Sequence, residues 1–247
     1  MKSQELDEIL TENFPYQEAL VGNGILYAGT KMILYGKYKT MKSMLSTKLG
    51  LCVSGGQPWL GFDTPEKGGV VLYVQLEIPK RMMQKRLRVM AQNCTLLKPF
   101  RIWTTHFMKL DSVVGFSELE QEVEEVRPQL LIIDPVYKIM TGDMLSANAI
   151  QGLLDNVDKL MGRYDGMSVV LVSHTRKGVF EEFGSDDLIG SVIFSAWADT
   201  VVKVERKEKG ELIVKFEIVR HATADIEPVV VEIDSELKLL PKEGVKV

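Results

Sequence analysis

The sequence predicts an α/β protein with a largely parallel, twisted sheet, helices on both faces of that sheet, and antiparallel strands toward the C-terminus. Through the first two thirds of the chain, short apolar runs alternate with stretches of helical periodicity, which is the order of a helix-covered parallel sheet. The remainder, 199–234, contains β-rich runs divided by Lys209-Gly210 and by Pro228. That punctuation favours antiparallel strands that extend the sheet.

The elements follow from the apolar pattern along the chain. Strands are expected where apolar residues run together between turn signals, at 25–28, 32–35, 69–76, 100–103, 130–134 and 168–173. Helices are expected where apolar residues recur at helical spacing, at 3–13, 41–53, 79–92, 116–127 and 149–164. We therefore predict an N-terminal helix and linker, 1–19, followed by one domain, 20–247.

The composition excludes several classes of protein. The chain has 247 residues, of which 45% are hydrophobic and 26% charged, and its formal net charge of −4 is unlike a surface covered with phosphate-binding charge. No apolar run approaches the ~18 residues of a membrane helix. Cys52 and Cys94 lack metal-type spacing and the N-terminus lacks a secretory core, so we expect a cytoplasmic protein without membrane contact.

The segment GKYKTMKS, which follows the apolar run 32–35, matches the phosphate-binding Walker A pattern at every fixed position but one. In such a loop the backbone N–H groups point at the phosphates, the lysine adds a positive charge, and the serine hydroxyl binds Mg²⁺. The segment therefore predicts binding of ATP with Mg²⁺. The alternative is an ordinary strand, turn and helix with solvated lysines. The nucleotide-binding residues are expected to be Gly36, Lys37, Tyr38, Lys39, Thr40, Met41, Lys42, Ser43 and Met44.

Met41 stands where the pattern has its second glycine. Glycine at this position lets the backbone adopt angles that side-chain-bearing residues avoid. We expect the loop to form with strain of about 1–3 kcal/mol, which contacts to phosphate and Mg²⁺ can offset.

Polar residues end three further predicted strands, and the carboxyl ends of strands are where ligands bind in open α/β sheets. Glu77 is a candidate general base, with a helix N-terminal acid as the alternative. Asp134 is a candidate Mg²⁺-holding acid, with an Asp-Pro turn as the alternative. His174 and Thr175 could sense the γ-phosphate, although a lone histidine at a strand end is more often structural.

These four segments, GKYKTMKS, LEIP, LLIIDP and VSHTRKG, resemble those of the RecA-like hexameric replicative helicases of the RepA and DnaB type from plasmids and phages. The resemblance covers about residues 20–232. It implies a RecA-like P-loop ATPase fold. It also implies roles for single residues: Lys42 and Ser43 for triphosphate and Mg²⁺, Asp134 as the second metal-holding residue, Glu77 as catalytic base, and His174 as γ-phosphate sensor.

The resemblance also implies a catalytic arginine finger that reaches the nucleotide of a neighbouring subunit, often within a Lys-x-Arg segment. In the segment EIVRHA, Arg220 matches the arginine and Ile218 stands where the lysine would be. A solvated arginine at a strand end is the alternative, and Lys215 or Arg206 could serve instead.

Two loops are candidates for contact with single-stranded DNA, 138–148 and 176–187. Within them Lys138, Arg176 and Lys177 are the candidate phosphate contacts, although four acidic residues crowd the second loop. The densest positive cluster lies elsewhere, in the predicted helix 79–92, where a charge run is usually a solvated face.

The function predicted is an ATP-hydrolysing ring motor, expected to be a hexamer, that translocates on single-stranded DNA and relies on a separate primase or loader. Two alternatives stay open. A RecA/RadA-like recombinase or mediator would form filaments through an exposed aromatic, which Phe14 could supply. A nucleotide-binding scaffold with little turnover would explain Met41 and the acidic second loop.

Overall fold

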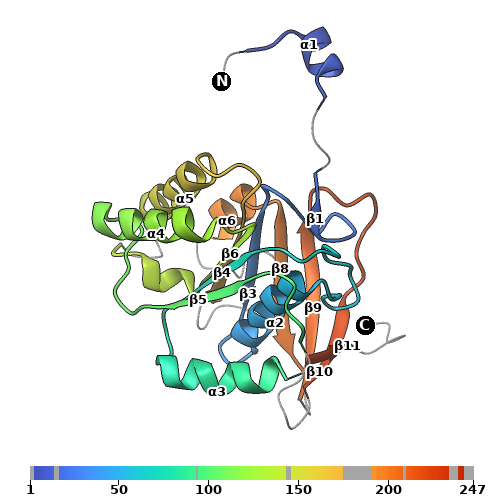
Figure 1. Cartoon of the computed structure of the whole chain (residues 1–247), viewed down its shortest axis with the longest axis vertical. Helices are drawn as coiled ribbons and strands as arrows, with labels where there is room; N and C mark the ends of the chain where they lie inside the picture. The colour runs from blue at the N-terminus through green and yellow to red at the C-terminus, as the bar shows by residue number, and fades with distance from the viewer. Residues whose placement is uncertain are drawn as a thin grey trace.

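The computed structural model describes residues 3–13, 17–92, 94–142, 146–174, 191–207, 210–233 and 239–241. Within these residues the chain forms a nine-stranded sheet of order β11-β10-β9-β8-β3-β7-β6-β4-β5, together with a small sheet of β1 and β2 (Figure 1). The predicted α/β class and the mostly parallel sheet are confirmed.

Six neighbouring strands of the large sheet are parallel and three are antiparallel additions at one side. The parallel strands are β3 (Lys31–Gly36), β4 (Val71–Gln75), β5 (Phe100–Thr104), β6 (Leu130–Asp134), β7 (Ser168–His174) and β8 (Thr200–Arg206). The antiparallel strands are β9 (Glu211–Val219), β10 (Val229–Ile233) and β11 (Leu239–Pro241).

The structure adds detail to two of the predicted strand regions. The first run of 199–234 forms β8, which pairs antiparallel with β9 as expected but also runs parallel to β3, after a short helix, α6 (Ser191–Trp197). The short strand expected near 25–28 is present as β2 (Leu26–Tyr27), and it forms a hairpin with β1 (Ala19–Val21).

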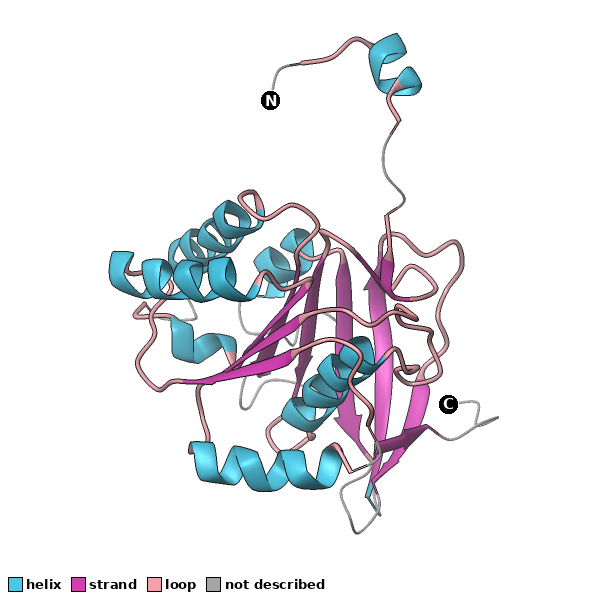
Figure 2. Ribbon diagram, viewed as in Figure 1, coloured by secondary structure: helices cyan, strands magenta, loops and turns pink. Residues whose placement is uncertain are grey.

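Helices cover both faces of the sheet (Figure 2). One face carries α2 (Lys42–Gly55) and α3 (Lys80–Met90), and the other carries α4 (Val113–Val126), α5 (Ala147–Met161) and α6. The N-terminal helix α1 (Leu6–Thr11) has no buried residue, and a 3-10 helix, η1 (Val136–Ile139), follows β6. None of the described helices combines the length and apolarity needed to cross a membrane.

The core has two layers, one on each side of the sheet. In β3, Met32 and Leu34 join the layer under α2, whereas Ile33 and Tyr35 join the layer under α4 and α5. Burial on both faces explains why the parallel strands read as almost unbroken apolar runs.

Two helices begin earlier than their apolar spacing predicts. Ser112 and Ser146 act as N-caps, because their hydroxyls accept hydrogen bonds from the backbone N–H groups of Gly115 and Ala149. The helices therefore start at residues 113 and 147, ahead of the predicted 116 and 149.

The parallel strands all end at one edge of the sheet, which we call the carboxyl edge. Gly36 and His174 are register partners there, and Asp134 pairs with Gln75 at the end of β4. Glu77 follows two residues after Gln75. The topology therefore gathers the predicted site residues of four strands along this edge.

Candidate functional site

The phosphate-binding loop joins β3 to α2 at the carboxyl edge. A side chain at Gly36 would place its Cβ 2.2 Å from the backbone oxygen of Val204 in β8. Glycine is thus required here because a neighbouring strand approaches closely. Beyond it, the Thr40 hydroxyl donates to the Lys37 carbonyl at 2.8 Å and closes the turn.

Met41 adopts the left-handed conformation, with φ 61° and ψ 23°. Its carbonyl accepts hydrogen bonds at 3.0 Å from the backbone N–H groups of Met44 and Leu45, which begin α2. Its partly buried side chain packs against the core layer under α2. The loop therefore forms with a side chain in a conformation that costs an L-residue about 1–2 kcal/mol, as expected from the missing glycine.

Lys42 turns its ammonium group back into this loop. Its Nζ donates to the carbonyl oxygens of Gly36 at 2.8 Å and Lys37 at 2.7 Å, and the residue is only 4% exposed. Burial lowers the pKa of Lys42 to about 8, against the opposing attraction of Asp134 and Glu77. An ammonium group that donates to main-chain carbonyls can donate to phosphate oxygens instead, because these are stronger acceptors.

Asp134 is 3% exposed, and a network of hydroxyl groups holds its carboxylate. The Tyr73 hydroxyl donates to Oδ2 at 2.6 Å and lies 2.9 Å from the Ser46 hydroxyl. Burial raises the pKa of Asp134, while hydrogen bonds from Tyr73 and Ser43 oppose that rise. The two predicted metal-binding residues, Ser43 and Asp134, are therefore brought together.

The chemistry of this pair fits Mg²⁺ bound together with a nucleotide. Among the described residues, no cluster of three or more His, Cys, Asp or Glu side chains could hold a metal ion alone. A hydroxyl and a carboxylate suit the hard Mg²⁺ ion, which usually takes its other oxygens from phosphate and water. Ser43 and Asp134 would hold the ion, and the nucleotide would complete its coordination.

His174 ends β7 with its imidazole between two tyrosines. Its ring stacks on Tyr38 with 4.3 Å between centroids and lies 5.7 Å from the ring of Tyr137. Burial and the Lys42 charge lower the pKa of His174 to about 4, so the ring is neutral at pH 7.

Several buried polar atoms at the carboxyl edge have no hydrogen-bond partner within the described part of the chain. They include both ring nitrogens of His174, the Ser173 hydroxyl and Oε1 of Gln75. An unsatisfied buried polar group is costly, and such groups gather where a ligand completes the bonding. The edge therefore fits a polar, multiply charged ligand such as a triphosphate.

Glu77 lies in the connection from β4 to α3, and its side chain is exposed. The Tyr137 hydroxyl donates to its Oε1 at 2.6 Å. Sequence reasoning did not identify Tyr137, Tyr73 or Gln75 as site residues. The signal for Tyr73 was available, since a tyrosine in an otherwise apolar buried strand usually needs a hydrogen-bond partner.

Arg220 lies opposite the carboxyl edge, at the end of the sheet where the parallel strands begin. It follows β9, whose end pairs with the start of β8, and its guanidinium donates to the carbonyls of Ala198 at 3.0 Å, Ala196 at 3.2 Å and Ser195 at 3.3 Å. These bonds satisfy the C-terminal carbonyls of α6 and its exit. Within one chain, Arg220 is therefore remote from the phosphate-binding loop.

The two substitutes for Arg220 have different surroundings. Arg206 ends β8 beside the loop, with Nη1 3.5 Å from the Lys39 carbonyl oxygen. Lys215 forms an ion pair with Glu205 at 2.7 Å.

Of the candidate DNA contacts, only Lys138 lies within the described residues. It belongs to η1, and its Nζ lies 5.5 Å from the ring centroid of Tyr137. Arg176, Lys177 and the proposed sensor Thr175 fall outside the described residues.

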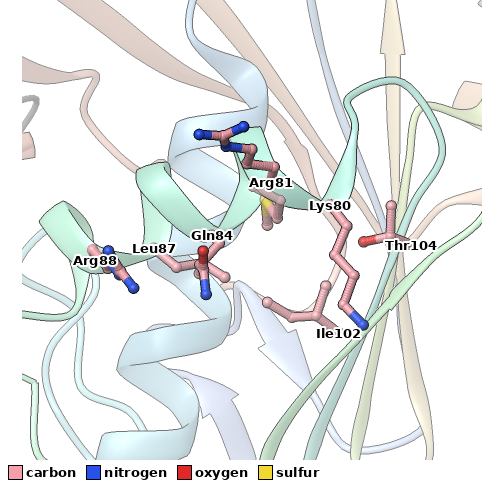
Figure 3. Close-up of a pocket in the computed structure, with 8 residues that line it drawn as sticks. Lys80, Arg81, Gln84, Leu87, Arg88, Ile102 and Thr104 are labelled. Atoms are coloured by element: carbon pink, nitrogen blue, oxygen red, sulfur yellow. The ribbon is translucent and has the colours of Figure 1, made fainter.

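A groove of about 760 Å³ lies between α3 and the edge strand β5. We call it the α3 groove. Figure 3 shows Lys80 and Gln84 extending from α3 on either side of Ile102. Its apolar lining includes Met83, Leu87 and Ile102, and its basic residues are Lys80, Arg81 and Arg88.

The profile of the AAA domain family matches residues 1–179. The chain belongs to the AAA domain family. No curated protein matches the sequence.

Solved structures show which form of the AAA domain fold this is. One solved ATPase domain has a TM-score of 0.68 and 15% identity, over 96% of this chain and 95% of that one. A KaiC-like protein from Pyrococcus horikoshii OT3 has a TM-score of 0.58 and 16% identity, over 90% and 93%. The flagellar accessory protein FlaH from Methanocaldococcus jannaschii has a TM-score of 0.57 and 10% identity, over 87% of this chain and 90% of that one. At these identities the likeness concerns the fold, which is the RecA-like P-loop fold.

The AAA domain assignment confirms the predicted P-loop ATPase, while the roles of single residues stay predictions.

The first prediction concerns Lys42 and the pH dependence of nucleotide binding. The pKa of Lys42 in the nucleotide-free protein is about 8, so the side chain is mostly charged below pH 8. Above pH 8 it is mostly neutral and must take up a proton before it can bind phosphate as an ammonium. The affinity for an ATP analogue is expected to fall about tenfold between pH 8 and pH 9.5. Fluorescence titration across this range measures it. Lys42→Arg, whose guanidinium stays charged, should bind with little pH dependence, and equal slopes for both proteins would contradict the assignment.

Met41 gives a second prediction for the AAA domain. Met41→Gly suits the left-handed conformation and should keep the analogue dissociation constant within about threefold. Met41→Val places a β-branched residue there, which should weaken binding about tenfold or more. The same titration measures both variants, with Met82→Val on the exposed side of α3 as the control. Equal binding by the Gly and Val variants would show that this conformation does not matter.

Proposed function

We propose that this AAA domain is the ATP-hydrolysing motor of a ring-shaped assembly, a hexamer, that translocates on single-stranded DNA in the manner of replicative helicases. The observation that carries the ATPase part is the meeting of Lys42, Ser43 and Asp134 at the carboxyl edge. Glu77 lies beside them, as do the two ring nitrogens of His174, which have no hydrogen-bond partner among the described residues. The helicase part is supported by the resemblance of four sequence segments.

Each residue at the carboxyl edge has a chemical task in this proposal. The backbone of the loop and Lys42 bind the phosphates, and Ser43 and Asp134 hold Mg²⁺. When bound, Mg²⁺ neutralises charge on the phosphates. Glu77 accepts a proton from the attacking water, and the N–H of neutral His174 donates to the γ-phosphate.

Contact with DNA is proposed for Lys138, with Arg176 and Lys177 as further contacts outside the described residues. The net charge of −4 requires such contact to be local. A strand held in the channel of a ring needs only a few basic residues from each subunit. A separate primase or loader would act beside the ring.

The assembly is proposed to form through α1 and the α3 groove of a second copy. Leu6, Ile9 and Leu10 of α1 are 69%, 45% and 71% exposed, and the same helix carries Asp7 and Glu8 in its first turn. An acidic helix with an exposed apolar side complements a groove with an apolar lining and basic residues.

The reach of α1 favours the groove of a neighbouring copy. Seven residues, 12–18, join α1 to β1, and they span at most about 25 Å. The β1–β2 hairpin lies at the edge opposite the carboxyl edge, since Tyr27 and Ile25 accept hydrogen bonds from Ser168 and Thr200 at the starts of β7 and β8. Figure 1 shows α1 and α3 at opposite ends of the molecule.

Arg220 is retained as the proposed arginine finger acting on a neighbour's nucleotide. Its place at the far edge of its own sheet suits a role between chains. To reach a neighbour, its guanidinium would leave the carbonyls of α6 and of Ala198 that it bonds here.

The function is tested by phosphate release. Wild-type protein with Mg-ATP should release phosphate faster when single-stranded DNA is added, and Glu77→Gln should lower that rate by at least a hundredfold while retaining nucleotide binding, because it removes the base. Glu66→Gln, a change at an exposed glutamate, is the matched control.

Each other result points to a different function. Nucleotide binding with no release in the wild type would favour a scaffold. Release accompanied by filaments in electron micrographs would favour a recombinase. Release that DNA leaves unchanged would contradict the proposed motor.

The assembly is tested by mass. With Mg-ATP, the wild-type chain should form a closed oligomer, and Lys80→Glu with Arg81→Glu should shift it to smaller species because the groove now repels α1. Adding Asp7→Lys and Glu8→Lys should restore the oligomer. Lys67→Glu, at an exposed position outside the groove, is the control. If the groove variant assembles like wild type, another surface joins the subunits.

A further inference from the structure

Tyr137 connects the candidate base to the segment proposed to touch DNA. It lies in η1, three residues after Asp134, and its hydroxyl donates to Oε1 of Glu77 at 2.6 Å. Burial and the neighbouring Glu77 raise the pKa of Tyr137, so the hydroxyl keeps its proton and acts as the donor.

This hydrogen bond affects the task proposed for Glu77. An O–H donor at 2.6 Å from a carboxylate oxygen is within the range of short, charge-assisted hydrogen bonds. While the bond exists, Oε1 of Glu77 accepts a hydrogen bond from the Tyr137 hydroxyl, and the carboxylate is directed toward η1. A general base must instead lie within hydrogen-bond reach of the attacking water.

The position of Tyr137 depends on η1 and its neighbours. Its ring lies 5.7 Å from the ring of His174, which stacks on Tyr38 of the phosphate-binding loop. Lys109 holds the end of η1 with two hydrogen bonds, because its Nζ donates to the carbonyls of Lys138 and Met140 at 2.7 Å each. A shift of η1 would therefore move the tyrosine hydroxyl relative to Glu77.

We infer that Tyr137 is a positioning residue that restrains Glu77 in the nucleotide-free domain, and that DNA bound at Lys138 shifts η1 and releases the base. Lys138 is adjacent to Tyr137 in the chain, so DNA bound to the Lys138 side chain acts directly on the segment that carries the Tyr137 hydroxyl. This inference rests on the proposed function, since it names how that same site is regulated.

The test compares Tyr137→Phe with wild type. The change removes the hydroxyl and keeps the ring beside His174. Without DNA, phosphate release should rise about tenfold, which is the factor that a hydrogen bond to a charged group can represent. At saturating DNA the rate should stay within about twofold of wild type, so the stimulation by DNA falls. The KM for ATP should not change. Tyr164→Phe is the matched control, because Tyr164 lies just before the start of β7, at the end of the sheet opposite the carboxyl edge.

A second variant tests the path through Lys138. Lys138→Ala should lower the stimulation by DNA in the wild-type background and change little in the Tyr137→Phe background, because the restraint is already gone. A merely structural role for Tyr137 would lower the rates with and without DNA together and would leave the effect of Lys138→Ala intact.

The outcomes separate this inference from the proposed function. If wild type is stimulated by DNA and depends on Glu77, but Tyr137→Phe hydrolyses ATP at the wild-type rate or more slowly without DNA, the restraint is overturned and the motor stands. If wild type shows no hydrolysis that depends on Glu77, both are overturned.

Discussion

A buried lysine ammonium at the carboxyl edge of the sheet is the interaction on which the site depends. Removing a charge from water is costly, so Lys42 is tolerated only because oxygen atoms surround it. Two of those oxygens are main-chain carbonyls of residues 36 and 37, whose positions are set by the bend of the loop. That arrangement requires a glycine at position 36, where β8 approaches too closely for a side chain, and a left-handed residue at Met41.

The same physical rule organises the acidic half of the site. Asp134 is buried as deeply as Lys42, and hydroxyl groups from β4 and α2 provide the hydrogen bonds that solvent would otherwise supply. In contrast, His174, Ser173 and Gln75 present buried polar atoms that lack partners in the described part of the chain. The charged groups are thus held in place by the protein, while polar atoms beside them are left for a ligand.

The strand ends and the loop could be predicted from sequence because they depend on local signals. A buried parallel strand reads as an apolar run, and the polar residue that ends it marks the carboxyl edge, which located Gly36, Asp134 and His174. Helix starts were predicted less well where a capping serine stood three or four residues before the predicted first helical residue, as at Ser146 and Ser112.

What could not be predicted depends on contacts between distant parts of the chain. The direction of β8 follows from α6, a helix too short to give a clear periodic pattern. The bonds of Arg220 to α6 and of Tyr137 to Glu77 join residues 24 to 60 positions apart in the sequence. An arginine or a tyrosine at such positions has the same local sequence whether it binds a neighbour, a ligand or water.

The most direct test of the central claim is calorimetric titration of Mg²⁺ and a non-hydrolysable ATP analogue into wild-type protein and Lys42→Met. The variant keeps the length of the side chain and removes its charge. If the ammonium is what the loop holds ready for phosphate, wild type binds one analogue per chain, and Lys42→Met binds at least a hundredfold more weakly while unfolding at or above the wild-type temperature without nucleotide. Equal binding by the two proteins would contradict the account.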